Sequence, residues 1–416
     1  MQIFSLTWQF HASRINSDCI KWIDASIKQG VNMPEKHQIV FYPVGNGDTS
    51  QVVLSQGRRI LFDFCHRKKA DSTETPEIDL KKRLKDELDA AGRDYFDVVA
   101  FTHADEDHIL GSTEFFELQH AAKYQGEGRI KIKQLWVPAA MAMQSASNDQ
   151  QSHEFVILRQ EARHRLLEGK DILIFSKPPE LMDWLVPKLK EQGEAANARD
   201  HLFIDAGKLV PGFNLLTDGA EFFCHSPFLK HYEDGDFIRN SAALVFNVRL
   251  QVGINTFDYL EIGDAHWEDL EDIVRITKWH KNEDRLAWDL INIPHHCSYK
   301  SLSDTKGDVE TDPKPLVKEL LLAGKSDSYI VSCSKPVVDV KESYDQIQPP
   351  HVQARKAYER YLKEVKGRKF LVTMEEPNAT KPEPLVFDVT TGGVSWTKSA
   401  LIGASAVVTS RPSRAG

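Results

Sequence analysis

The sequence lacks any apolar run long enough to cross a membrane. No stretch approaches the roughly 20 residues that a spanning helix needs, and the N-terminus shows no basic segment followed by an apolar one, as a secretory signal would. The apolar stretch at 400–404 is short and rich in small residues. We therefore expect a cytoplasmic protein that makes no use of a membrane.

The sequence also has few cysteines and no net positive charge. The five cysteines are odd in number and widely spaced, which excludes a disulfide framework and a Cys-x-x-Cys metal site. Acidic residues outnumber basic ones by 61 to 52, and the net charge of −9 excludes a general attraction for nucleic acid. A local basic groove stays possible, because composition does not report how charges are distributed.

The order of apolar patterns predicts an α/β fold. Short strands are predicted at 39–42, 51–54, 60–62, 98–101, 134–137, 221–224, 243–246, 257–262, 288–293, 328–331 and 385–387, and helices at 17–30, 77–91, 109–118 and 267–277. Strands that alternate with helices favour a sheet whose functional groups gather along one edge.

The length of 416 residues allows one large domain with insertions or two domains. We divide the chain into an N-terminal extension (1–36), one catalytic domain (37–398) and a flexible tail (399–416). Residues 140–215 are mostly polar and helix-like, and are predicted to form a helical insertion packed over one side of the domain.

Four metal-binding side chains follow the apolar strand at 98–101 within six positions: His103, Asp105, Asp107 and His108. Imidazoles and carboxylates together suit zinc, manganese or iron. A loop at the end of a buried strand could arrange all four around metal ions, whereas an ordinary helix or strand face could not. The alternative is a polar turn with two incidental histidines. This interpretation is weaker, because four such residues at the end of one strand rarely lack a role.

Two later strands also end in possible ligands. Asp264 follows a glycine at the end of the strand at 257–262, and His295 and His296 follow the strand at 288–293. Gly-Asp alone is commonly a turn or a helix cap, and a lone histidine is more often structural. A pair of histidines at a third such junction favours one ligand and one substrate-facing acid or hydrogen-bond donor.

Several neighbours of these residues are assigned no role in binding. Glu106 is predicted to be solvated, and His266 and Glu268 are predicted to be solvated or to cap the helix at 267–277. Cys297 has no basic partner in the sequence, so we interpret it as a small packed residue.

Together these motifs resemble the metallo-β-lactamase fold hydrolases. The Thr-His-x-Asp-x-Asp-His run at 102–108 is similar to their second motif, and is closest to the competence-type (ComEC-like) branch, in which aspartate replaces the middle histidine. The other matching segments lie in the same order at 44–48, 60–63, 240–245, 263–265, 295–298 and 350–351. The resemblance runs from about residue 37 to 387 and leaves both termini and the 140–215 segment uncovered.

The resemblance implies a fold and a ligand set. The fold would be an αββα sandwich of two mixed sheets flanked by helices. His103 and Asp105 would hold one divalent ion, Zn²⁺ or Mn²⁺. Asp107, His108 and His296 would hold a second one. Asp264 would bridge the two ions, and His295 would face the substrate. For the third motif of the family, His225 is the best-placed ligand, with Asn240 and His231 as weaker candidates.

The chain departs from the family pattern in two ways. Cys297 stands where the branch has a glycine after the histidine pair, which would narrow the mouth of the site. The membrane channel that accompanies this domain in competence proteins is missing from the sequence, so we do not expect DNA uptake through this chain.

The expected function is metal-dependent hydrolysis by a hydroxide that two metal ions activate, with Asp107 and His295 as catalytic residues. A phosphodiesterase, most simply a nuclease with a nucleic-acid substrate, is the first interpretation. Small esters, lactones, thioesters or β-lactams are the alternative substrates. A metal-bound interaction protein without catalysis is the weakest alternative.

Overall fold

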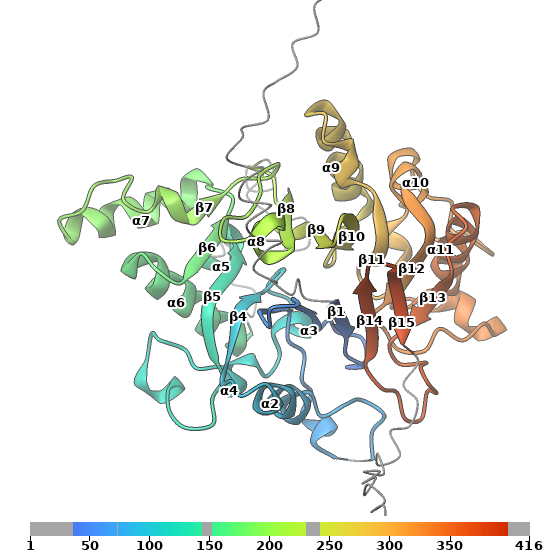
Figure 1. The fold of residues 1–416 in the computed structure, drawn as a ribbon, viewed down its shortest axis with the longest axis horizontal. Helices are drawn as coiled ribbons and strands as arrows, with labels where there is room; N and C mark the ends of the chain where they lie inside the picture. The colour runs from blue at the N-terminus through green and yellow to red at the C-terminus, as the bar shows by residue number, and fades with distance from the viewer. Residues whose placement is uncertain (1–35, 73, 144–151, 230–241, 398–416) are drawn as a thin grey trace, which may run out of the picture.

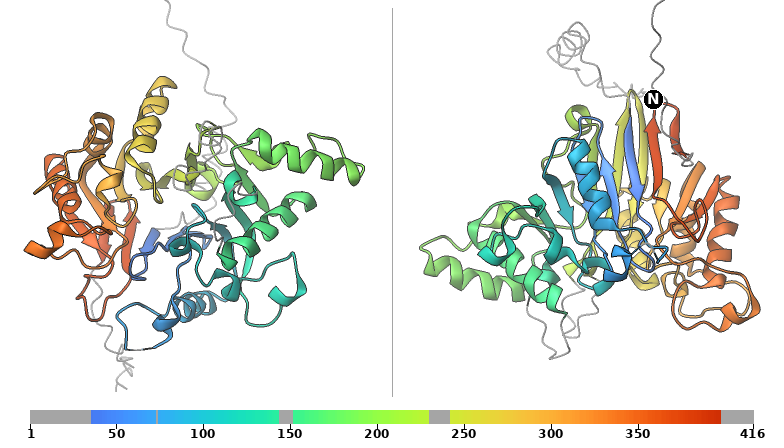
Figure 2. Two further views of the ribbon diagram at one scale, coloured as in Figure 1. Left: turned by 180° about the vertical axis from the view of Figure 1, so that it is seen from behind. Right: turned by 90° about the horizontal axis from the view of Figure 1, so that it is seen from below.

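Two mixed β-sheets pack face to face, and helices cover the outer face of each sheet (Figure 1; Figure 2). The computed structural model describes residues 36–72, 74–143, 152–229 and 242–397. The predicted helix at 17–30, the tail and the candidate ligands His231 and Asn240 lie outside the described residues. The layered architecture confirms the predicted α/β sandwich of two mixed sheets flanked by helices.

The larger sheet has nine strands and the smaller has six, within the described residues. The larger sheet has the spatial order β15 (Gly393–Thr397), β14 (Leu385–Thr390), β1 (His37–Phe41), β2 (Ser50–Val53), β3 (Arg59–Phe62), β4 (Tyr95–Ala100), β5 (Lys131–Pro138), β6 (Ile172–Phe175) and β7 (Phe203–Ile204). The smaller sheet has the order β13 (Lys369–Val372), β12 (Gly324–Ser332), β11 (Trp288–Asn292), β10 (Asn255–Glu261), β9 (Val245–Val252) and β8 (Ala220–Ser226).

Each sheet changes from antiparallel to parallel pairing partway across. In the larger sheet the pairs from β15 to β3 are antiparallel and those from β3 to β7 are parallel. In the smaller sheet the pairs from β8 to β10 are antiparallel and those from β10 to β13 are parallel. The carboxyl ends of parallel strands lie along one edge of a sheet, so loops that follow β4, β10 and β11 can meet there.

Large aromatic side chains fill the space between the two sheets. Trp136 of β5 packs edge-to-face against Phe222 of β8, with ring centroids 5.4 Å apart, and lies 5.7 Å from the Phe246 ring of β9. Each of these side chains is fully buried. This apolar layer holds the two sheets together and so fixes the distance between their edges.

The longer helices bury one apolar face each. The larger sheet is covered by α2 (Leu80–Ala90), α6 (His153–Glu168) and α7 (Pro179–Glu191), and the smaller by α9 (Trp267–Trp279), α10 (Pro315–Leu322) and α11 (Val352–Glu364) (Figure 2). In α2, for example, Asp79 caps the first turn by accepting from the Lys82 backbone N–H, and Leu80, Leu84 and Leu88 recur at a spacing of four residues on the buried face.

Shorter helical turns connect these elements. They are α3 (Glu106–Ile109), α4 (Ser112–Phe115), α5 (Ala139–Ala142), α8 (Leu215–Asp218), η1 (Lys68–Asp71), η2 (Ala122–Tyr124), η3 (Asp200–Leu202), η6 (Glu283–Arg285), η7 (Tyr299–Ser301) and η8 (Lys341–Asp345). None of the described helices combines the length and the apolarity that crossing a bilayer would require.

Two predicted elements differ from the structure. The helix expected at 109–118 is instead the pair α3 and α4, because Gly111 between them has a φ of 79° and ends the helical path. The segment at 140–215 contains α6 and α7, and it also contains β6 and β7, which extend the larger sheet. The four apolar residues of β6 are all buried, and a run that short does not separate strand from helix by periodicity.

Candidate metal centre

Four buried side chains from four separate segments converge where the edges of the two sheets meet. Asp48 precedes β2, His108 lies in α3 after β4, Asp264 follows β10 and His296 follows β11. One ligand atom of each lies within 4.8 Å of the ligand atoms of the other three. The larger sheet therefore contributes two members of the cluster and the smaller sheet the other two.

The distances within the cluster leave room for a cation. His108 Nε2 lies 3.2 Å from Asp264 Oδ1 and 3.7 Å from Asp48 Oδ2, and His296 Nε2 lies 3.0 Å from Asp107 Oδ2. Neither carboxylate oxygen of Asp48 forms a hydrogen bond, and neither does His108 Nε2, although all three atoms are buried. Buried charged atoms without partners are costly, and a divalent ion would satisfy them.

A second group of ligand atoms adjoins the first through Asp264. His103 Nε2 lies 3.9 Å from Asp264 Oδ2 and 3.8 Å from Asp105 Oδ2, and it has no hydrogen-bond partner. Asp264 thus presents Oδ1 to His108 and Oδ2 to His103. Its two carboxylate oxygens therefore face the two groups of ligand atoms separately.

Asp63, at the end of β3, orients both histidines of the motif at 102–108. Its carboxylate accepts hydrogen bonds from the Thr102 backbone N–H and hydroxyl, both at 2.6 Å, and from His108 Nδ1 at 2.7 Å. Since the Thr102 hydroxyl donates to Asp63, it accepts from His103 Nδ1, 3.0 Å away. Both rings then carry their proton on Nδ1 and present the Nε2 lone pair to the cluster, which is the form that binds metal.

The histidine pair sits on a left-handed turn. His295, His296 and Cys297 have φ angles of 52°, 53° and 66°, a region that residues other than glycine rarely adopt. The Asp264 carboxylate accepts from the His295 backbone N–H at 3.1 Å, and His296 Nδ1 donates to the Cys333 carbonyl at 2.8 Å. The turn thereby aims His296 Nε2 at the cluster and leaves the His295 side chain partly exposed beside it.

The electrostatics of the cluster favour positive charge. Burial opposes ionisation of Asp264, but His108 and His296 outweigh it and hold the pKa of that carboxyl well below its usual range. Burial also opposes charge on His296, yet the carboxylates around it raise the pKa of the ring to about 9. Burial raises the pKa of Asp48 to about 6. The carboxylates of the cluster thus stabilise positive charge at this point, which a bound metal ion would supply.

The cluster is open on the side of Asp107 and His295. The side chains of these two residues are 33% and 24% exposed, whereas those of the four clustered residues are buried. A cavity of about 450 Å³ adjoins Asp107 and is also lined by Arg67, Glu106 and Leu110. The cavity therefore reaches the cluster through Asp107, whose carboxylate contacts His296 Nε2.

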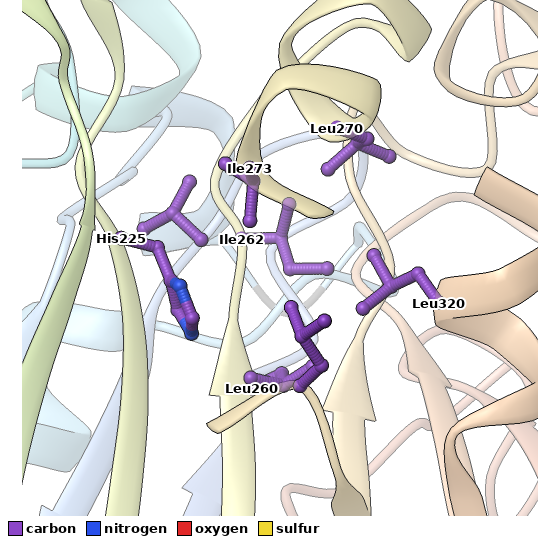
Figure 3. Close-up of a pocket in the computed structure, with 8 residues that line it drawn as sticks. His225, Leu260, Ile262, Leu270, Ile273 and Leu320 are labelled. Atoms are coloured by element: carbon purple, nitrogen blue, oxygen red, sulfur yellow. The ribbon is translucent and has the colours of Figure 1, made fainter. Parts of the chain in front are cut away.

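The structure places His225 outside the cluster. Alternate residues of β8 face opposite sides of the sheet, and Cys224 points into the layer between the sheets, so His225 points towards α9. One ring nitrogen pairs with the Thr277 hydroxyl at 3.1 Å and the other with the Arg285 carbonyl at 3.0 Å. Figure 3 shows the ring among the apolar side chains that line a small pocket. His225 is therefore a buried structural histidine, and its predicted ligand role is corrected.

Asp48 is the member of the cluster that sequence reasoning did not identify as a ligand. Its turn was recognised only as a matching segment at 44–48, and Gly-Asp pairs are common in turns. Gly47 gives the local signal, because a Cβ at this position would lie 2.6 Å from Cys65 Sγ and 3.0 Å from the Asp107 backbone oxygen. The glycine lets the turn pack against the motif at 102–108, and this brings Asp48 to His108.

Comparisons with known proteins give structural neighbours only. No protein-family model and no curated protein matches the chain. A diphosphatase from the PhnP family aligns at 10% identity over 85% of this chain and 98% of its own, with a TM-score of 0.32. The long form of RNase Z from yeast aligns at 12% identity over 89% of this chain and 46% of its own, with a TM-score of 0.35.

A β-lactamase from Chitinophaga pinensis aligns at 11% identity over 78% of this chain and 90% of its own, with a TM-score of 0.26. These neighbours are hydrolases of the metallo-β-lactamase fold. At such identities and TM-scores, nothing about the substrate of this chain follows from them. The geometry of the cluster is what supports a functional assignment.

Proposed function

We propose that this chain is a metal-dependent hydrolase that cleaves phosphodiesters, most simply a nuclease. The observation that carries the proposal is the convergence of Asp48, His108, Asp264 and His296, whose ligand atoms lie within 4.8 Å of one another. His103 and Asp105 would hold a second divalent ion, with Asp264 between the two. Asp107 would complete the first ion's ligand set.

Divalent ions bound here would lower the pKa of a coordinated water and offset the negative charge that develops on a phosphoryl oxygen. The chain's own contribution is geometric. Asp63 and the Cys333 carbonyl fix the tautomers of the ligating rings, and the sandwich of sheets holds the ligands in place. His295, on the open side, is positioned to hydrogen-bond a substrate oxygen or to protonate a leaving alkoxide.

Cationic side chains at the open side support a phosphodiester over an uncharged ester. Arg67 lines the cavity beside Asp107, and Lys300 follows the histidine turn. The Arg67 guanidinium donates to the Val44 and Asn46 carbonyls, so it would act on a phosphodiester through its positive charge rather than by direct hydrogen bonds. The assignment to the competence-type branch rests on the sequence motifs and stays a prediction.

The test is cleavage of single- and double-stranded DNA and RNA by purified protein supplied with Mn²⁺ or Zn²⁺. We expect wild-type cleavage that is lost in Asp107→Ala and Asp264→Asn. Asp89→Asn is the control, since Asp89 is an exposed carboxylate of α2 that lies outside both the cluster and the cavity beside Asp107. The proposal fails if the wild type cleaves no nucleic acid or other phosphodiester, or if Asp107→Ala cleaves as well as the wild type.

One observation favours a second function, the hydrolysis of a small uncharged ester, lactone, thioester or β-lactam. Glu106 and Asp107 both line the cavity, and together with the net charge of −9 they disfavour a polyanion. Activity on chromogenic carboxylic esters with none on bis-p-nitrophenyl phosphate would select this function instead.

A further inference from the structure

His266, two residues after Asp264, is the N-cap residue of helix α9, and its ring has a fixed hydrogen-bonding role. A capping box joins His266 to Asp269: the His266 backbone N–H donates to the Asp269 carboxylate at 3.1 Å, and the His266 ring accepts from the Asp269 backbone N–H. An imidazole nitrogen that accepts a hydrogen bond carries no proton. This nitrogen is Nδ1, because the other ring nitrogen, Nε2, has no hydrogen-bond partner.

The other ring nitrogen must then be the donor. Because Nδ1 is an acceptor, the proton of the neutral ring is on Nε2. His266 Nε2 is buried and has no hydrogen-bond partner. A buried N–H without an acceptor is unfavourable, so this atom is poised for an acceptor that the protein itself does not provide.

The His266 ring, whose Nε2–H lacks an acceptor, lies beside His295 on the open side of the cluster. The His266 ring stacks on the ring of His295, with centroids 5.5 Å apart and an angle of 24° between the planes. His295 Nδ1 is likewise buried without a partner and lies 3.9 Å from Asp264 Oδ2. Besides His295, the ionisable groups near enough to influence the charge of His266 are Asp264, Asp105 and Lys300. Divalent ions at the cluster would neutralise the two carboxylates and leave the lysine as the uncompensated charge.

We propose that His266 binds the substrate, with its Nε2–H donating to an anionic phosphoryl oxygen held beside the metal centre. The assignment rests on the proposed function, which supplies the phosphoryl group. His266, His295 and Lys300 would form one oxyanion subsite of two imidazoles and an ammonium group. The subsite selects a tetrahedral oxyanion, because each of its groups donates a hydrogen bond and none needs to accept one.

The alternative for His266 is a capping role alone, and two substitutions separate these roles. Asparagine is a good N-cap residue whose Oδ1 can take the place of Nδ1, so His266→Asn keeps the cap and removes the Nε2 donor. Glutamine places an amide N–H near the former Nε2 position but caps poorly, so His266→Gln keeps a donor and weakens the cap.

The first measurement is the tautomer itself. Long-range ¹H–¹⁵N correlation of histidine-labelled full-length protein reports which ring nitrogen carries the proton, and the His266 signals are those missing from His266→Asn. We expect a proton on Nε2 that changes its chemical shift when inorganic phosphate is added to the metal-loaded protein. A proton on Nδ1, or no response to phosphate, overturns the proposal.

The second measurement is calorimetric titration of inorganic phosphate into metal-loaded protein. His266→Asn should weaken phosphate binding roughly tenfold or more, with metal content and thermal midpoint as in the wild type. His266→Gln should retain more phosphate affinity but melt at a lower temperature. Equal phosphate affinity in the wild type and His266→Asn overturns the inference and leaves the hydrolase proposal standing. A wild type that holds no metal overturns the hydrolase proposal, and the inference with it.

Discussion

Asp63 is not one of the clustered ligands, but its hydrogen bonds determine which ring nitrogen of His108 carries the proton. Its carboxylate accepts from Thr102 and from His108 Nδ1, and asparagine could offer only one oxygen to these donors. An amide N–H facing His108 Nδ1 would move the ring proton to Nε2, where it blocks coordination.

We expect Asp63→Asn to lower metal affinity roughly 10- to 100-fold. Competition with a fluorescent chelator measures this directly. The control is Asp97→Asn, a partly buried aspartate of β4 that pairs with Arg93 away from the cluster. Equal metal affinities in wild type and Asp63→Asn would show that the tautomers do not depend on Asp63.

His225 should make stability depend on pH. Burial lowers the pKa of this ring from 6.5 to about 4 in the folded protein, so the unfolded chain binds more protons between these values. Stability is therefore complete above pH 6.5 and falls as the pH drops towards 4, by on the order of 3 kcal/mol.

Urea unfolding of wild type and His225→Gln at pH 7 and pH 4.5 tests this. Glutamine does not titrate and can still bond Thr277 and the Arg285 carbonyl, so its stability should change less with pH. The same pH dependence in both proteins would contradict the assignment. A loss of bound metal in His225→Gln would restore the ligand role that the structure corrects.

At the scale of elements, the turn that carries Asp48 depends on close packing. Arg67 Nη1 donates to the Val44 carbonyl at 2.7 Å, and Asn46 Nδ2 donates to the Pro349 carbonyl at 2.8 Å. These bonds fix the shape of the turn, and the Asp48 backbone N–H holds it against the motif at 102–108 by donating to the Asp107 carbonyl at 3.1 Å. Gly47 leaves no room there for a side chain.

Gly47→Ala should displace this turn, lowering the free energy of unfolding by about 1–3 kcal/mol and weakening metal binding. Gly392→Ala is the matched control: its φ is not positive, and its Cβ would meet only the Thr390 hydroxyl at an ordinary 3.6 Å. Denaturant unfolding and metal titration of both variants give the result. Unchanged metal affinity in Gly47→Ala would show that the position of Asp48 does not matter for metal binding.

Sequence patterns predicted most strands because local alternation and turn residues mark them. They also placed His103, His108, Asp264 and His296 at the carboxyl ends of strands, where parallel pairing brings them to one edge. They missed β6, whose four apolar residues carry no period. They also misassigned His225, because a one-residue change of position along β8 reverses the face of the sheet.

Asp48 shows the limit of the same reasoning at the site. Its role depends on the approach of the turn at 44–48 to α3, a tertiary contact with no periodic signal in either segment. Resemblance to the competence-type pattern marked the turn as a matching segment without indicating what it does. Only the packing of the two segments identifies Asp48 as a ligand candidate.

At the scale of the whole molecule, a bound ion would join the two sheets. Asp48 and His108 belong to the larger sheet, and Asp264 and His296 to the smaller. Because the ligands come together only in the folded chain, binding should stabilise the fold, by about 2.7 kcal/mol when free metal is a hundredfold above its dissociation constant.

We expect Mn²⁺ or Zn²⁺ to raise the thermal midpoint of chelator-treated protein, and Asp264→Asn to abolish this rise. Differential scanning calorimetry with and without each metal measures it. A thermal midpoint that does not change when metal is added would mean that the cluster does not bind the metal.

Anomalous diffraction from crystals grown with Zn²⁺ or Mn²⁺ tests the central claim most directly. The account predicts a peak at the junction of the sheets, about 2.0–2.2 Å from His108 Nε2, His296 Nε2 and an oxygen of Asp264. Well-ordered crystals with no peak there, or with the ion bound only elsewhere, would contradict it.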